Sequence, residues 1–171
     1  MSGYKIIDVD THVTETPDLW TSRVPASMKD DVPRIDLDGK GRQWWFLGDR
    51  RIANPGLTAT AGVGDMTNWP TSYEEMHPGA FDAEERLKYM DEMGIWAMVM
   101  YPNVAGFGNQ EFLKLKDPDL KETCVKVYND WQTEWASADS RRLLPITSTP
   151  FWDVDAAVRE VRRGHAMGHK G

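Results

Sequence analysis

An unbroken apolar run from Ile95 to Tyr101 constrains the fold of this chain more than any other feature. It follows Gly94 directly, and Gly94 ends a segment, residues 82–93, whose apolar positions recur at helical spacing. A strand with one face in water alternates apolar and polar residues, so a run without alternation predicts a strand buried on both faces. The two segments together predict a helix that leads into a strand of a parallel sheet.

The same order of elements recurs along the chain. Residues 4–10 and 143–149 have the composition of strands, and residues 117–138 and 153–163 that of helices. Asp82 and Asp117 stand at N-cap positions. Strands that alternate with helices predict an α/β fold with a parallel sheet and right-handed crossovers.

An insertion interrupts this order after the first strand, at about residues 34–80. Residues 34–52 contain a turn signal, Asp38–Gly41, between apolar segments, and we expect a β-hairpin there. Residues 53–80 are rich in Gly, Pro, Thr and Asn and predict a long irregular loop, a kind of segment that is often functional.

The end of the first strand carries Asp8, Asp10 and His12 at alternate positions, which predicts one shared face. Buried carboxylates need partners, and a divalent cation is one. We therefore predict Asp10 and His12 as metal ligands at the carboxyl end of the strand. The alternative is a loop cap at Asp10 and an ordinary loop histidine. Asp8 either orients His12 or is a polar core residue bonded to backbone.

Two further residues are candidates for substrate binding, Glu15 and Asn103. Glu15 follows the Asp10 and His12 pair, and Asn103 ends the second strand. The alternatives are a solvated loop acid and a turn-forming asparagine. His77, His165 and His169 are not expected to be ligands, and no residue is assigned as the catalytic acid or base.

The segment from Ile6 to Glu15 resembles the opening of the amidohydrolase-2 family of the amidohydrolase superfamily. That family includes enzymes like aminocarboxymuconate semialdehyde decarboxylase and γ-resorcylate decarboxylase. Later segments resemble it in the same order, at residues 86–95, 101–103, 128–131 and 141–145. The resemblance implies that residues 1–171 are the N-terminal portion of a single (β/α)8 TIM barrel domain, with a β-hairpin and loop insertion after the first strand. It also implies an acid-x-His metal pair on Asp10 and His12.

The resemblance implies a metal-dependent hydrolase or nonoxidative decarboxylase that acts on a small aromatic or unsaturated carboxylate. One divalent metal ion is implied, with zinc expected and manganese as the alternative. The remaining metal ligands of the family and its general acid or base would follow residue 171, so we expect the isolated chain to be inactive. The competing hypothesis is a non-catalytic α/β interaction module derived from half of a barrel.

Charge and composition limit the kinds of molecule that this chain is expected to bind. The net charge of −7 argues against a nucleic-acid surface, because phosphate binding needs clustered Lys and Arg. A single cysteine, Cys124, and an N-terminus unlike a signal peptide predict a cytoplasmic protein, and no apolar stretch is long enough for a membrane span. The partners expected are a small-molecule substrate and, because an open sheet edge favours association, a second copy in a homodimer or a longer parent chain.

Overall fold

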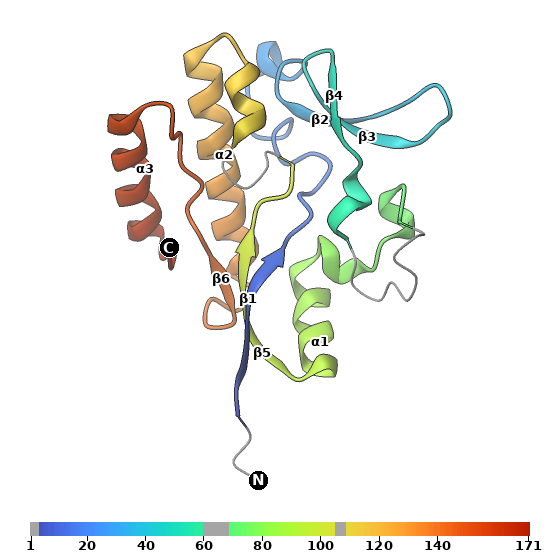
Figure 1. Ribbon diagram of the computed structural model, residues 1–171, viewed down its shortest axis with the longest axis vertical. Helices are drawn as coiled ribbons and strands as arrows, with labels where there is room; N and C mark the ends of the chain where they lie inside the picture. Colours follow the sequence, from blue (N-terminus) through green and yellow to red (C-terminus); the bar gives the residue numbers. More distant parts are fainter. Residues whose placement is uncertain (1–3, 60–68, 105–108) are drawn as a thin grey trace.

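The computed structural model describes residues 4–59, 69–104 and 109–171 (Figure 1). Strands and helices alternate as the sequence predicted, and the parallel sheet has the strand order β1-β5-β6. Among the described residues this sheet stays open at both edges and no barrel closes. The elements of this part of the fold are β1 (Ile6–His12), α1 (Ala83–Met93), β5 (Ile95–Tyr101), α2 (Pro118–Ala136), β6 (Leu143–Pro145) and α3 (Val154–Met167).

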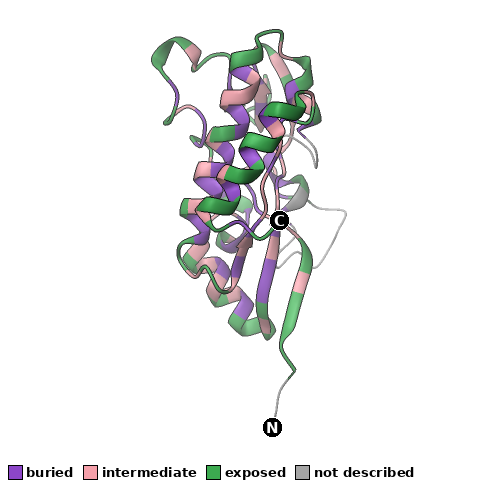
Figure 2. Cartoon of the chain, turned by 90° about the vertical axis from the view of Figure 1, so that its left-hand side faces the viewer, coloured by how far each residue is buried: buried purple, intermediate pink, exposed green. Residues whose placement is uncertain are grey.

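Strand β5 is central, and its inner residues Ala97, Met98 and Met100 are buried, as the apolar run predicted. Strand β1 differs from the prediction of a strand buried on both faces. Ile7 and Val9 are 51% and 64% exposed, and Figure 2 shows most of the strand as exposed. In the described part of the chain β1 pairs with β5 alone and forms an edge of the sheet.

The insertion forms a second, antiparallel sheet, which extends the predicted hairpin by one strand. Asp38 fixes the first turn by accepting from the backbone N–H groups of Lys40 and Arg42. The bond from Arg42 is the main reason that the pKa of Asp38 lies below its ordinary value. The strands of this antiparallel sheet are β2 (Pro33–Leu37), β3 (Gln43–Leu47) and β4 (Arg50–Ala53).

Short 3₁₀ turns occur in the remaining connections, including the part of residues 53–80 that was predicted as an irregular loop. Part of the expected loop, residues 60–68, lies outside the described residues. In Figure 1 the insertion lies beyond the carboxyl ends of the parallel strands, the end where the predicted site residues stand. The turns are η1 (Ala26–Met28), η2 (Pro55–Thr58), η3 (Tyr73–Glu75), η4 (Pro78–Ala80) and η5 (Gln110–Lys114).

The predicted caps of α1 and α2 are confirmed. Asp82 accepts from the N–H of Glu85, and Asp117 accepts from the N–H groups of its second and third following residues. Gly94 ends α1 with a φ of 70°, a conformation that suits glycine. Met93, the last residue of α1 and one of the apolar positions at helical spacing, is exposed.

Helix α3 and strand β6 depart from the prediction in length. Gly164 was expected after the helix, but α3 continues to Met167 and ends at Gly168. Val161 of this helix is half exposed. Strand β6 stops at Pro145, because proline has no N–H to donate to the ladder.

The C-terminal residues take up pairing where β6 stops. The N–H of Lys170 donates to the carbonyl of Pro145, and the N–H of Thr147 donates to the carbonyl of Gly171. This tail therefore runs along the sheet edge beside β6, where the alternating pattern placed a further strand.

One core joins the insertion to the α/β layers. Trp20 is fully buried and packs against Trp45 of β3, Phe112 of η5 and Tyr128 of α2. Its indole N–H donates to the backbone carbonyl of Cys124 at 2.9 Å. In the described part of the chain, no helix has the length and apolarity needed to cross a membrane.

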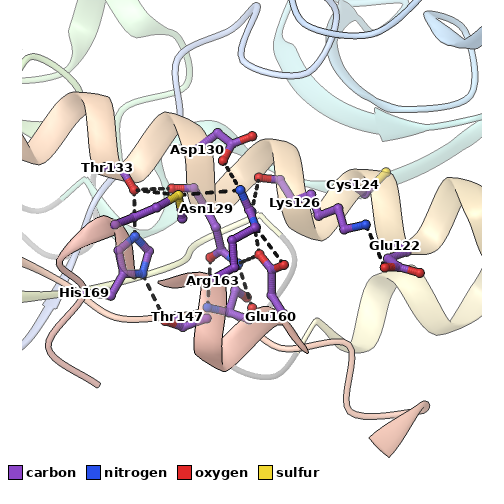
Figure 3. A network of polar contacts seen from close by, with 12 residues as sticks. Glu122, Cys124, Lys126, Asn129, Asp130, Thr133, Thr147, Glu160, Arg163 and His169 are labelled. Atoms are coloured by element: carbon purple, nitrogen blue, oxygen red, sulfur yellow. Dashed lines mark hydrogen bonds and ion pairs between the residues drawn. The ribbon is translucent and has the colours of Figure 1, made fainter. Parts of the chain in front are cut away.

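A polar network fastens α3 and the tail to α2 (Figure 3). The Asn129 side chain donates to the buried carboxylate of Glu160, and Arg163 bridges Glu160 to Asp130. The ring nitrogens of His169 lie 2.8 Å from the hydroxyl of Thr133 and 3.1 Å from that of Thr147. These contacts connect the end of the chain to the centre of the fold.

Gly164 provides a test of the packing between α3 and the segment after β6. A Cβ atom at this position would lie 2.1 Å from Oγ1 of Thr147, so Gly164→Ala should lower the free energy of unfolding by about 1–3 kcal/mol. Gly39→Ala is the matched control, because a Cβ there has no heavy atom within 4 Å. Urea denaturation of both variants measures the difference. Equal stability of the two would contradict the close approach.

Candidate functional site

A β-bulge shapes the carboxyl half of β1. Asp8 pairs with Met98 and Thr11 pairs with Met100, so three steps along β1 match two along β5. Oδ1 of Asp8 accepts from the N–H of Asp10 at 3.1 Å, and Oδ2 accepts from the hydroxyl of Thr11 at 3.0 Å. A side chain that binds a nearby backbone N–H competes with the ladder, which accounts for the irregular register.

The bulge corrects the predicted arrangement of side chains. Asp8 lies opposite Met98 and His12 lies opposite Tyr101, and these partners are three residues apart on β5. Regular alternation is therefore interrupted between Asp8 and His12, and the face that the two share cannot be derived from strand periodicity across this segment. Asp8 bonds to the backbone N–H of Asp10, as the alternative interpretation held.

A different group orients His12. Its Nδ1 lies 2.9 Å from the carbonyl oxygen of Pro102, which follows β5. A carbonyl only accepts, so Nδ1 carries the proton and the lone pair of the ring belongs to Nε2. Metal-binding histidines commonly show this arrangement, in which a backbone carbonyl fixes the tautomer.

Asp10 and His12 line one cavity of about 270 Å³, so the structure brings the predicted pair together. The cavity lies between β1, α1, β5 and the end of the insertion. No cluster of three or more His, Cys, Asp or Glu side chains suited to a metal ion occurs among the residues that the structure describes. The residues that line the cavity are Asp8, Asp10, Thr11, His12, Ala59, Ala80, Arg86, Tyr89, Ile95 and Met98.

Arg86 of α1 is a site residue that the sequence analysis missed. It is 5% exposed and donates from Nη2 to the carbonyl of His12 at 3.1 Å. It also donates to the carbonyls of Gly79 and Ala80. Burial lowers the pKa of Arg86 to about 10, so the group stays charged at neutral pH. The sequence contained one indication of this role. Arg86 lies four residues before the buried Met90, and this spacing places its charge on the inner face of the helix.

Glu15 is fully buried and does not line the cavity, so the interpretation as a solvated loop acid is wrong. Oε1 accepts from the N–H groups of Asn103 and Val104 at 2.9 and 3.0 Å. Burial raises the pKa of Glu15 to about 7 against the effect of these two bonds. Asn103 also lies outside the cavity lining, and its backbone is held by Glu15.

Two other histidines, His77 and His169, make hydrogen bonds that give them a structural role. Nδ1 of His77 accepts from the N–H of Gly79 and caps η4. His169 lies between two threonine hydroxyls in the network of Figure 3.

Comparison with known proteins supports the fold and leaves the family open. No protein-family model matches the sequence, and no curated protein matches it. A crystal structure of an amidohydrolase from Mycobacterium avium subspecies paratuberculosis matches with a TM-score of 0.74 and 25% identity. The match covers 99% of this chain and 49% of that one, so this chain spans about half the length of the amidohydrolase.

A second solved structure is more distant. It is a dihydroxybenzoic acid decarboxylase from a Polaromonas species, with bound manganese and the inhibitor 2-nitroresorcinol. The TM-score is 0.51 and the identity 16%, over 96% of this chain and 36% of that one. At this identity the likeness shows the fold alone. Both neighbours are consistent with the expected partial barrel.

The buried Glu15 predicts a measurable dependence of stability on pH. Its pKa is about 7 in the folded chain against 4.5 for the ordinary group, so the folded state holds the proton more tightly. The resulting stabilisation is complete below pH 4.5 and is lost as the pH rises through 7. Glu15→Gln should remove this loss and be more stable than the parent chain at pH 8, by roughly 3 kcal/mol or less. Thermal unfolding between pH 5 and 8 measures it.

Glu134→Gln is the matched control for this experiment, since the Glu134 side chain is 64% exposed on α2. It should leave the pH profile of the parent chain unchanged. A parent chain whose stability is flat from pH 5 to 8 would contradict the assignment to Glu15.

Proposed function

We propose that this chain is part of a metal-dependent enzyme of the amidohydrolase type, with Asp10 and His12 as its first two metal ligands. One observation carries the proposal. Both residues line the same cavity, and the Pro102 carbonyl holds the His12 ring in the tautomer that has its lone pair on Nε2. The structural likeness to an amidohydrolase supports the same conclusion.

The donors suit a divalent cation such as zinc or manganese. A carboxylate oxygen and an imidazole nitrogen are ligands that both ions accept, and the Polaromonas decarboxylase contains manganese. Two donors do not complete a site, because catalytic zinc ions usually have three protein ligands. We propose that the part of the barrel corresponding to the unmatched half of the amidohydrolase supplies the remaining ligands and the general acid or base.

The charges around the cavity suit this role. The positive charge of Arg86 interacts with the negative charge of Asp8. Asp10 is the other carboxylate of the cavity lining, and we propose it as the one that binds the cation. Asp10 is exposed, so it reaches the cavity without the cost of complete burial. A metal held here would supply Lewis-acid chemistry to the oxygen atoms of a substrate or to water.

The substrate proposed is a small aromatic or unsaturated carboxylate, and the reaction is a hydrolysis or a nonoxidative decarboxylation. The structural neighbours include an amidohydrolase, which supports hydrolysis, and decarboxylation is proposed from the resemblance of the first strand. Glu15 and Asn103 remain proposed as residues of the substrate-binding rim. Asn103 would contact the substrate, and Glu15 would act by holding the backbone of Asn103.

The second candidate function is a non-catalytic interaction module derived from half of a barrel. The observation that favours it is the incomplete donor set among the described residues. The two proposals differ in whether Asp10 and His12 bind metal.

Manganese binding by the purified chain separates the two proposals. Titration calorimetry with Mn²⁺ should give a Kd that Asp10→Ala and His12→Ala each raise at least about tenfold, because each removes a direct ligand. Asp18→Ala and His165→Ala are matched controls, because both side chains are exposed and outside the cavity. They should leave the Kd unchanged. Equal affinity of all five proteins for Mn²⁺ would favour the interaction module.

A homodimer is proposed for the chain as it stands. The outer face of α3 exposes Val154, Val158 and Val161, and apolar faces of this kind favour association. Light scattering should give twice the 19.5 kDa of one chain, and Val158→Asp should give a monomer. Leu113→Asp is the control, because Leu113 has the same 43% exposure as Val158 but lies on η5. A parent chain that is monomeric at high micromolar concentration would refute the dimer.

A further inference from the structure

Two charged residues line the cavity without being proposed as metal ligands, Asp8 and Arg86. Asp8 is half buried, and Arg86 is almost completely buried. Burying charge is costly unless the group makes good polar contacts. The contacts of these two residues are specific, because each includes the backbone of one member of the Asp10 and His12 pair.

Asp8 acts on the backbone of Asp10. Its carboxylate accepts from the Asp10 N–H and from the Thr11 hydroxyl, and these bonds create the bulge. The register has another irregularity between Ile6 and Ile7, before Asp8. Without the Asp8 bonds the segment after Asp8 would pair step for step with β5, and its residues would shift by one position in the register. The direction of the Asp10 side chain therefore depends on Asp8.

Arg86 acts on the backbone of His12. Its guanidinium donates to the His12 carbonyl and, from other N–H groups of the same fork, to the carbonyls of Gly79 and Ala80. It thereby ties the end of β1 to η4 of the insertion, across the cavity wall. A lysine has one nitrogen and does not match this set of acceptors.

The geometry points to Asp8 and Arg86 as positioning residues, Asp8 holding the backbone of Asp10 in the bulge and Arg86 holding the backbone of His12. This inference rests on the proposed function, because it assigns a purpose to the geometry of a proposed ligand pair. It adds two residues, from β1 and α1, to a site otherwise defined by Asp10 and His12 alone.

The test compares Asp8→Val with Asp8→Asn. Asp8→Val removes both acceptors, whereas Asp8→Asn keeps an oxygen for the Asp10 N–H and replaces the other oxygen, which accepts from the Thr11 hydroxyl, with an uncharged NH2 group. In Asp8→Val the exchange of the Asp10 amide hydrogen, followed by NMR without metal, should be roughly fivefold faster. The Kd for Mn²⁺ should rise about tenfold or more, as for other groups that orient metal ligands. Asp8→Asn should stay within about threefold of the parent chain in both measurements.

Arg86 is tested in parallel with Arg86→Lys and Arg86→Met. Both should weaken Mn²⁺ binding about tenfold or more, because neither side chain can donate to all three carbonyls. Circular dichroism identifies an Arg86 variant that has not folded. In that case the Asp8 pair, at a half-exposed position on an edge strand, still decides the question.

Each outcome has a separate meaning. If Asp8→Val matches the parent chain in amide exchange and in Mn²⁺ affinity while Asp10→Ala does not bind, the positioning role is wrong and the metal site stands. If Asp8→Asn loses as much affinity as Asp8→Val, the charge of Asp8 or its bond to the Thr11 hydroxyl matters rather than the hydrogen bond from the Asp10 N–H, which also overturns the inference. If the parent chain and Asp10→Ala bind Mn²⁺ equally, the proposed function fails, and the positioning role fails with it.

Discussion

The hydrogen bond from the Asp10 N–H to the Asp8 carboxylate is the interaction on which the arrangement of the site depends. It replaces a regular ladder position with a bulge near the carboxyl end of an edge strand. An edge strand tolerates this change, because no second neighbour fixes its other side. In this bulge the Asp8 carboxylate holds the backbone of Asp10, and both residues line the cavity with His12.

Much of the fold could be predicted from local sequence, because its main signals are local. The caps at Asp82 and Asp117 and the apolar run of β5 depend on a few neighbouring residues, and all three are confirmed. The errors arise where distant segments decide. Gly164 lies within α3 where Thr147 of a distant segment packs against it, so its glycine serves a close approach rather than a helix end.

The candidate site was predictable only in part, for the same reason. Asp10 and His12 stand out from sequence because polar residues at a strand end are unusual in a parallel sheet. The cavity contains both. The alternation rule failed at Asp8 because a side chain competed for the backbone, an event that strand periodicity does not encode. Arg86 escaped notice because its acceptors are carbonyls contributed by other segments.

Burial of ionisable groups near the end of β1 indicates that this region is organised for geometry rather than for stability. Among the described residues, Arg86 is buried with no carboxylate in hydrogen-bond contact, and Glu15 is buried with Oε2 unpartnered. Each desolvated group opposes folding, and apolar residues of similar size would avoid that cost. Both instead bind backbone atoms of the loops that follow β1 and β5. Such contacts fix where those loops lie, and the position of His12 and Asn103 follows from them.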